Sequence, residues 1–69
     1  MVEIFKTNVK NNKQAKRLTA ILSHAFTTFR FHFDLEDCDK ILRVEGPTIP
    51  IETIIVVVTT QGHHCEIIK

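Results

Sequence analysis

Apolar and polar side chains alternate strictly from residue 29 to residue 36. The apolar positions are Phe29, Phe31, Phe33 and Leu35, and the polar positions are Arg30, His32, Asp34 and Glu36. Successive side chains of a β-strand point to opposite faces of the sheet, so this period of two predicts a strand with one buried face. The chain is therefore expected to build its core against one face of a sheet.

Three other segments have strand patterns, and one long segment has a helical pattern. Strands are predicted over residues 2–9, 40–44 and 65–68, with Asp37-Cys38-Asp39 as the hairpin turn between the second and third strands. From about Asn12 the apolar residues recur at helical spacing. This amphipathic helix is predicted to end before Thr27.

A second helix is predicted from Pro50. Proline suits the first helical position, and Glu52 complements the positive end of the helix dipole. An apolar stripe at i, i+3, i+4 and i+7 consists of Ile51, Ile54, Ile55 and Val58. Residues 53–60 are β-branched throughout, so local propensity alone favours a strand there. The stripe and the proline favour a helix that stops at Gly62.

The order βαββαβ, without a linker or repeat, predicts one domain over residues 1–69. Right-handed crossovers would place two helices on one face of a four-stranded antiparallel sheet, with the first and third strands central, which is a ferredoxin-like α+β sandwich. The hairpin is expected at the end of the sheet opposite the first loop, which gives a basic end and an acidic end. Cys38 and Cys65 are expected to remain unbonded because their strands lie at opposite edges.

Composition and motifs exclude several classes of protein. The chain is 43% hydrophobic with a net charge of +1, and its longest apolar run, residues 54–58, is too short to span a bilayer. Two cysteines are too few for a disulfide scaffold, and the first residues lack a signal pattern, so a cytoplasmic location is expected. Without a nucleophile–base set or a glycine-rich phosphate loop, the chain is not expected to be an enzyme.

Two segments carry a family resemblance. Residues 34–46 form an acidic turn and a short strand ending in Val44-Glu45-Gly46, and residues 61–68 form a glycine turn and a closing strand. This pattern resembles the heavy-metal-associated domain family, which includes small copper chaperones, nearly end to end. The resemblance implies the same fold and places Val9, Asn11 and Gln14 at the Met and the two Cys of the family's Met-x-Cys-x-x-Cys metal motif.

Asn11 and Gln14 are therefore interpreted as degenerate metal-loop positions. Two thiolates bind a soft ion such as Cu(I), whereas neutral amide oxygens are poor ligands for it. No cofactor is expected, and the function indicated is a non-catalytic module for protein interaction or regulation.

Basic residues around the first helix are the predicted partner-binding residues: Lys10, Lys13, Lys16 and Arg17. Cations at a helix N-terminus oppose its dipole, which indicates an acidic protein partner, although a merely solvated helix face has the same pattern. In copper chaperones, a lysine-rich surface in this region docks an acidic partner domain.

The open sheet face suggests a second kind of contact. It is predicted to carry Val2, Ile4, Ile41 and Ile68, which favours a homodimer through this face. Nucleic acid is not expected there, because the strand phenylalanines face the core rather than the open side.

His63, His64 and Cys65 form the alternative candidate site. They would make this a noncanonical copper- or zinc-binding or transport protein. The competing interpretation makes His63 a turn residue and Cys65 a small buried hydrophobic residue.

Overall fold

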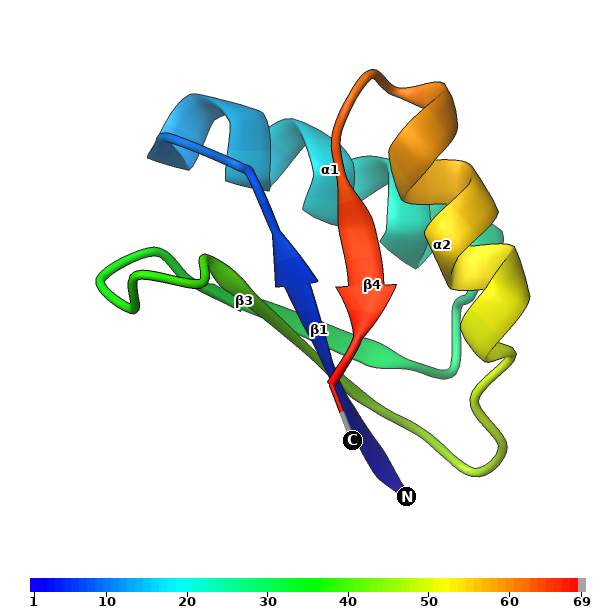
Figure 1. Ribbon diagram of the computed structural model, residues 1–69. Helices are drawn as coiled ribbons and strands as arrows, with labels where there is room; N and C mark the ends of the chain where they lie inside the picture. Colours follow the sequence, from blue (N-terminus) through cyan, green and yellow to red (C-terminus); the bar gives the residue numbers. More distant parts are fainter. Residues whose placement is uncertain (69) are drawn as a thin grey trace.

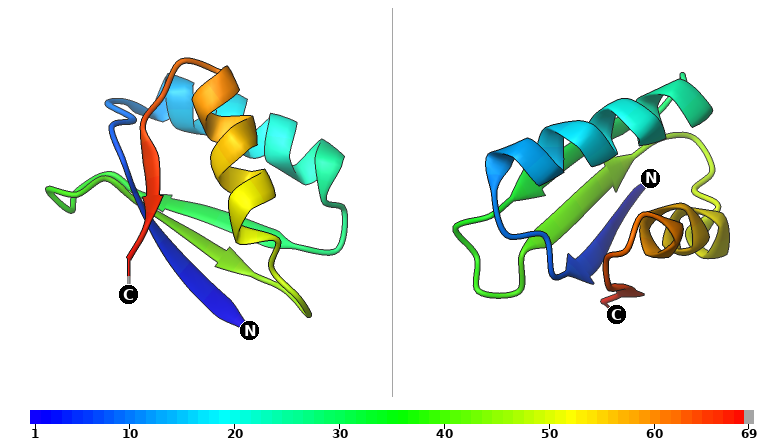
Figure 2. Two further views of the ribbon diagram at one scale, coloured as in Figure 1. Left: turned by 45° about the vertical axis from the view of Figure 1, so that its right-hand side comes forward. Right: turned by 90° about the horizontal axis from the view of Figure 1, so that it is seen from above.

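The computed structural model describes residues 1–68 and shows the six predicted elements in order (Figure 1). They are β1 (Val2–Thr7), α1 (Asn12–Ala25), β2 (Arg30–Asp34), β3 (Ile41–Glu45), α2 (Ile51–Thr60) and β4 (Cys65–Ile67). The strands form one sheet in the order β2-β3-β1-β4, with every neighbouring pair antiparallel. Both helices cover the same face (Figure 2). The predicted ferredoxin-like sandwich is confirmed, with β1 and β3 central.

The core lies between this face of the sheet and the two helices. Its fully buried side chains come from the central strands and from both helices, and the largest of them are Phe5, Leu18, Leu22, Leu42 and Ile54. Burying a side chain of this size stabilises the fold by about 1.5–3 kcal/mol relative to leaving it exposed. The alternation along β2 is also present, but Phe31 and Phe33 are only partly buried because β2 is an edge strand.

The β-branched segment forms helix α2, as predicted. Ile54 and Val58 are fully buried on its inner side, so tertiary packing outweighs the low helix propensity of these residues.

The predicted role of Pro50 as the first helical residue was wrong. Pro50 caps the helix with non-helical backbone angles, and its carbonyl accepts the Ile54 N–H at 3.0 Å, so the first helical residue is Ile51.

Strands β1 and β2 are shorter than predicted. β1 ends at Thr7 rather than Val9, because beyond Thr7 the Val9 N–H turns toward the Thr7 hydroxyl at 3.3 Å. Val9 stays fully buried even so. β2 ends at Asp34, since residues 35 and 36 already belong to the turn.

The predicted placement of the acidic hairpin was also wrong. The Thr7 N–H donates to the Asp39 carbonyl at 3.1 Å, so the β2–β3 hairpin lies beside the loop that leaves β1. The reason is topological: the β1-α1-β2 crossover brings β2 back parallel to β1, so both strands end on the same side. The basic and acidic segments are therefore adjacent in the structure, whereas the sequence predicted them at opposite ends.

Gly46 lies at the opposite end of the sheet, where it allows the ring of Phe29 to pack. A Cβ at position 46 would stand 2.5 Å from a ring carbon of Phe29, closer than real contacts allow. The Phe29 ring is itself held by stacking on Phe26, with centroids 5.5 Å apart and an interplanar angle of 6°. The aromatic cluster thus requires glycine at this position.

We predict that Gly46→Ala lowers the free energy of unfolding by about 1–3 kcal/mol, the usual cost of overpacking. The measurement is urea denaturation followed by circular dichroism. In a Phe29→Ala background the same substitution should cost much less, because the clashing ring is gone. An equal cost in both backgrounds would contradict the steric explanation.

Candidate functional site

The side chains of Asn11 and Gln14 cap helix α1. The Gln14 N–H donates to Asn11 Oδ1 at 2.9 Å, and the Lys10 N–H donates to Gln14 Oε1 at 2.9 Å. The first N–H groups of a helix have no partner within it, and amide oxygens satisfy them. The two predicted degenerate positions therefore have a structural role that sequence comparison with the metal motif did not reveal. The signal was present in the sequence as an Asn followed three residues later by Gln.

The loop between β1 and α1 is fixed to the other loops at this end of the molecule. Asn8 Oδ1 accepts the His64 N–H at 2.7 Å, which joins it to the turn before β4. The Thr7 hydroxyl donates to the Lys40 carbonyl, which joins the end of β1 to the β2–β3 hairpin. The first loop and the last turn therefore lie at the same end of the sheet. Three loops therefore meet around the start of α1.

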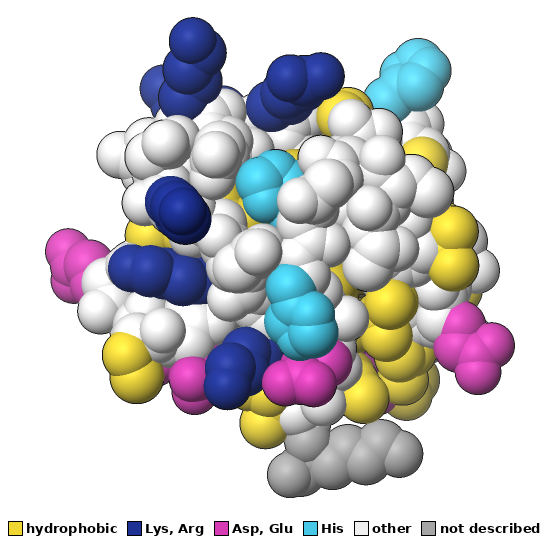
Figure 3. All heavy atoms as spheres, turned by 45° about the horizontal axis from the view of Figure 1, so that its top comes forward, with side chains coloured by type: hydrophobic (Ala, Val, Ile, Leu, Met, Phe, Trp, Pro, Cys, Tyr) yellow, Lys and Arg dark blue, Asp and Glu magenta, His cyan; other side chains and the backbone are white. Residues whose placement is uncertain are grey.

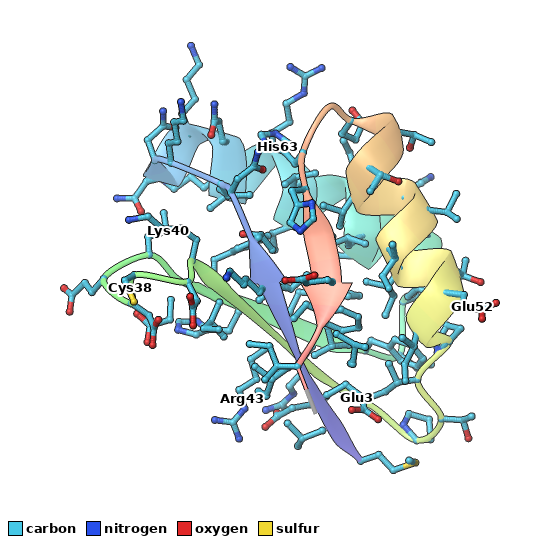
Figure 4. All side chains as sticks on the ribbon, viewed as in Figure 1. Glu3, Cys38, Lys40, Arg43, Glu52 and His63 are labelled. Atoms are coloured by element: carbon cyan, nitrogen blue, oxygen red, sulfur yellow. The ribbon has the colours of Figure 1, made fainter. Side chains whose placement is uncertain are left out.

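The structure does not gather the side chains of His63, His64 and Cys65 into one ligand set. Among residues 1–68, only Asp37, Cys38 and Asp39 bring three possible ligand atoms within 4.8 Å of one another. His64 is exposed and lies 3.7 Å from the carboxylate of Glu66. His63 is half-buried beside the top of β4 (Figure 4).

Cys65 is a buried thiol. Burial raises its pKa, the neighbouring charge of Glu66 adds a smaller increase, and together they bring the pKa from 9.0 to about 11. A raised pKa disfavours the thiolate, which is the form that binds metals and attacks electrophiles. The environment of Cys65 is thus that of a small core residue.

The Asp37-Cys38-Asp39 group was not among the predicted site residues. It lies at the tip of the hairpin, where Cys38 and Asp37 are exposed (Figure 4). The Asp39 N–H donates to Asp37 Oδ1 at 2.8 Å, which is the hydrogen bond of an ordinary Asx turn. Asp39 also lies 3.6 Å from the ammonium of Lys6. These contacts show that the three side chains lie close together because they form the turn of the hairpin.

Cys38 and Cys65 are both free thiols, as predicted.

The predicted partner-binding residues form one exposed surface, which we call the basic surface: Lys10, Lys13, Lys16 and Arg17. Figure 3 shows Lys and Arg side chains gathered over this part of the molecule, with acidic side chains toward its margins. Within residues 1–68 none of these four cations is ion-paired with a carboxylate. The first turn of α1 also contains no acidic residue. Positive potential from the side chains and from the helix terminus therefore adds up here.

The open sheet face is more polar than a hydrophobic dimer surface. Cross-strand pairs place Ile4 opposite Arg43 and Val2 opposite Glu45. Arg43 donates to Glu45 at 2.9 Å. Val2 and Ile68 are exposed, as predicted, whereas Ile4 and Ile41 are half-buried between the charged side chains. A shallow hollow of about 200 Å³ is lined by Arg30, His32, Arg43 and Glu45.

Comparison with protein-family models, with curated proteins and with solved structures finds no match. Neither helix of the described chain has the length and apolar character that crossing a bilayer requires.

We predict that Cys65 reacts slowly with iodoacetamide in the folded protein. In a Cys38→Ser variant at pH 8, labelling of the folded protein should be at least about 100-fold slower than labelling in denaturant. The reason is that a pKa raised by about two units lowers the thiolate population about a hundredfold. Mass spectrometry of quenched samples measures both rates. A Cys65→Ala variant, which keeps the exposed Cys38, is the control and should label without denaturant. Equal rates for Cys65 with and without denaturant would show that the thiol is accessible and ionised.

Proposed function

We propose that this protein is a non-catalytic interaction domain that binds an acidic protein partner through its basic surface. In this proposal the chain has the architecture of a heavy-metal-associated domain and has replaced the metal ligands. The two free thiols are consistent with the reducing cytoplasm that we propose as its location.

The observation that carries the proposal is the uncompensated charge at the start of α1. The neighbouring hairpin offers several carboxylates, yet within residues 1–68 only Lys6 pairs with one of them, Asp39. The four cations of the basic surface remain exposed. Lys13 lies in the first turn of α1, where a cation opposes the helix dipole by about 0.3–1 kcal/mol. A carboxylate-rich partner would relieve this repulsion and would be steered toward the surface by its field.

The capped loop supports the same proposal. Asn11 and Gln14 use their oxygens to hold the first turn of α1, so the loop keeps its shape without an ion. Asn8 ties the loop to the turn before β4. A rigid loop presents the adjacent cations with little loss of conformational freedom on binding, which favours affinity.

Soft-metal binding at His63, His64 and Cys65 is not favoured by the geometry. The three ligand atoms do not converge, and the thiol of Cys65 is buried with a raised pKa. We therefore propose no resident metal at this turn.

We predict that reversing two charges of the basic surface weakens binding to an acidic probe. A Glu-rich decapeptide titrated into the labelled protein should shift the amide NMR signals of residues 10–17, with an affinity that falls as salt rises. Lys13→Glu/Arg17→Glu should weaken the binding about tenfold or more, since each lost charge pair contributes up to about 1 kcal/mol.

The matched control is Arg30→Glu/Arg43→Glu, which removes the same charge from the open sheet face. This variant should bind the peptide nearly as well as the wild type does. Equal losses in the two variants would show that binding follows net charge and would overturn the assignment to the basic surface.

We also predict that restoring thiols at the loop creates a metal site. Asn11→Cys/Gln14→Cys should bind one Cu(I) in competition with a chromophoric chelator under reducing conditions, whereas the wild type should not compete. Asn11→Ala/Gln14→Ala loses the same helix cap without adding thiols, and it should not bind either. Tight wild-type binding that disappears in Cys65→Ala would instead establish the site at the last turn and contradict the proposal.

A further inference from the structure

Strand β2 is the long free edge of the sheet. It ends the order β2-β3-β1-β4 and pairs only with β3. The opposite edge, β4, has only three residues and lies beside α2. An edge strand offers a row of unpaired backbone N–H and C=O groups, and proteins usually protect edges with short length, charged side chains, proline or bulges. β2 has charges of opposite sign at its two ends, Arg30 and Asp34, which a strand of complementary charge can pair with. The five residues of β2 contain no proline.

A groove of about 520 Å³ runs between β2 and helix α1. On the strand side it is lined by the half-buried rings of Phe31 and Phe33. On the helix side its lining includes a stripe of small side chains at helical spacing, Ala15, Thr19, Ala20 and Ser23. The groove and the free edge are adjacent, so one occupant could pair with the strand and fill the groove.

The sequence of β2 is complementary to itself when two copies run antiparallel. The strand reads Arg30-Phe31-His32-Phe33-Asp34. With a two-fold axis at His32, Arg30 of one copy lies opposite Asp34 of the other, and Phe31 lies opposite Phe33. This register pairs all five residues and keeps charged side chains on the open face and aromatic ones on the helix face. Opposite charges and aromatic pairs are the cross-strand combinations that stabilise sheets.

We propose that this protein forms a symmetric homodimer in which β2 pairs with β2 of a second copy, making one continuous sheet. The two-fold axis brings the α1 helices of the two copies side by side over the joined strands. The small side chains of the α1 stripe allow those helices to approach closely and to cover the phenylalanine rings. The contact is isologous, so it closes at two copies and leaves no further edge of this kind.

A second copy fits this edge better than an acidic peptide does. Asp34 is exposed at one end of β2, and Glu36 follows it, so an all-acidic strand would meet repulsion there. A second copy supplies an Arg for that Asp and an Asp for Arg30. The paired residues of β2 are not part of the basic surface, although Lys16 of that surface also lines the groove, so the strand pairing does not depend on the function proposed above.

The test is sedimentation equilibrium of the full chain between about 10 μM and about 1 mM, the range that covers weak association. The wild type should approach twice its 8.0 kDa mass. Arg30→Asp places Asp opposite Asp, and Asp34→Arg places Arg opposite Arg, so each variant should weaken dimerisation about 10- to 100-fold. The double variant Arg30→Asp/Asp34→Arg should restore it. An equimolar mixture of the two single variants should form a heterodimer, because their charges are again complementary.

Glu52→Lys is the matched control, since it changes the net charge as much as Asp34→Arg does and its exposed side chain lies on α2, outside β2 and the groove. It should dimerise like the wild type. A wild type that stays monomeric to about 1 mM would overturn the proposal, as would an acidic peptide whose NMR contacts map to β2 of a monomer. A dimer that is insensitive to the single reversals would place the interface elsewhere, for example on the open sheet face, and would also overturn it.

Discussion

The pairing of strand β1 with both β3 and β4 holds the two halves of the molecule together. β1 comes from the first βαβ half and lies between two strands of the second, with Phe5 opposite Leu42 of β3 on one side and Ile67 of β4 on the other. β4 has three residues and no other strand to pair with. Two-stranded pairs are marginal in water, so a sheet with enough apolar area to receive two helices exists only when β1 is in place. Phe5 is fully buried at this centre.

The start of α1 shows that the two positions interpreted as a degenerate metal loop have a structural role of their own. A helix N-terminus leaves backbone N–H groups without partners, and Asn11 Oδ1 accepts one of them, that of Gln14. Gln14 Oε1 in turn accepts the N–H of Lys10, just before the helix. Thiolates at the same positions could bind a soft ion, but amides bring no charge there. Within residues 1–68 the four cations of the basic surface pair with no carboxylate, which is the basis of the proposed contact with an acidic partner.

The chain offers two separate surfaces for contacts, and both arise from the first crossover. Because α1 returns the chain to β2, the helix flanks the edge strand, while its N-terminal turn lies at the far end of that strand beside the acidic hairpin. The cations therefore lie near the N-terminus of α1, and the small side chains lie on the side of the helix that lines the groove. An acidic partner and a second copy would meet different parts of the same helix.

The sequence by itself determined the order and type of the elements, because the period of two in residues 29–36 and the helical spacing after Asn12 follow directly from how strands and helices orient side chains. It also identified the cluster of cations at residues 10–17, because their nearness in the chain needs no tertiary information. Tertiary structure decided the rest. Residues 53–60 favour a strand locally, and only the burial of Ile54 and Val58 makes the helix stable. The side on which the hairpin lies depends on the direction of β2, and the free edge beside α1 depends on strand order. Both are relations between segments distant in the chain, which no local pattern encodes.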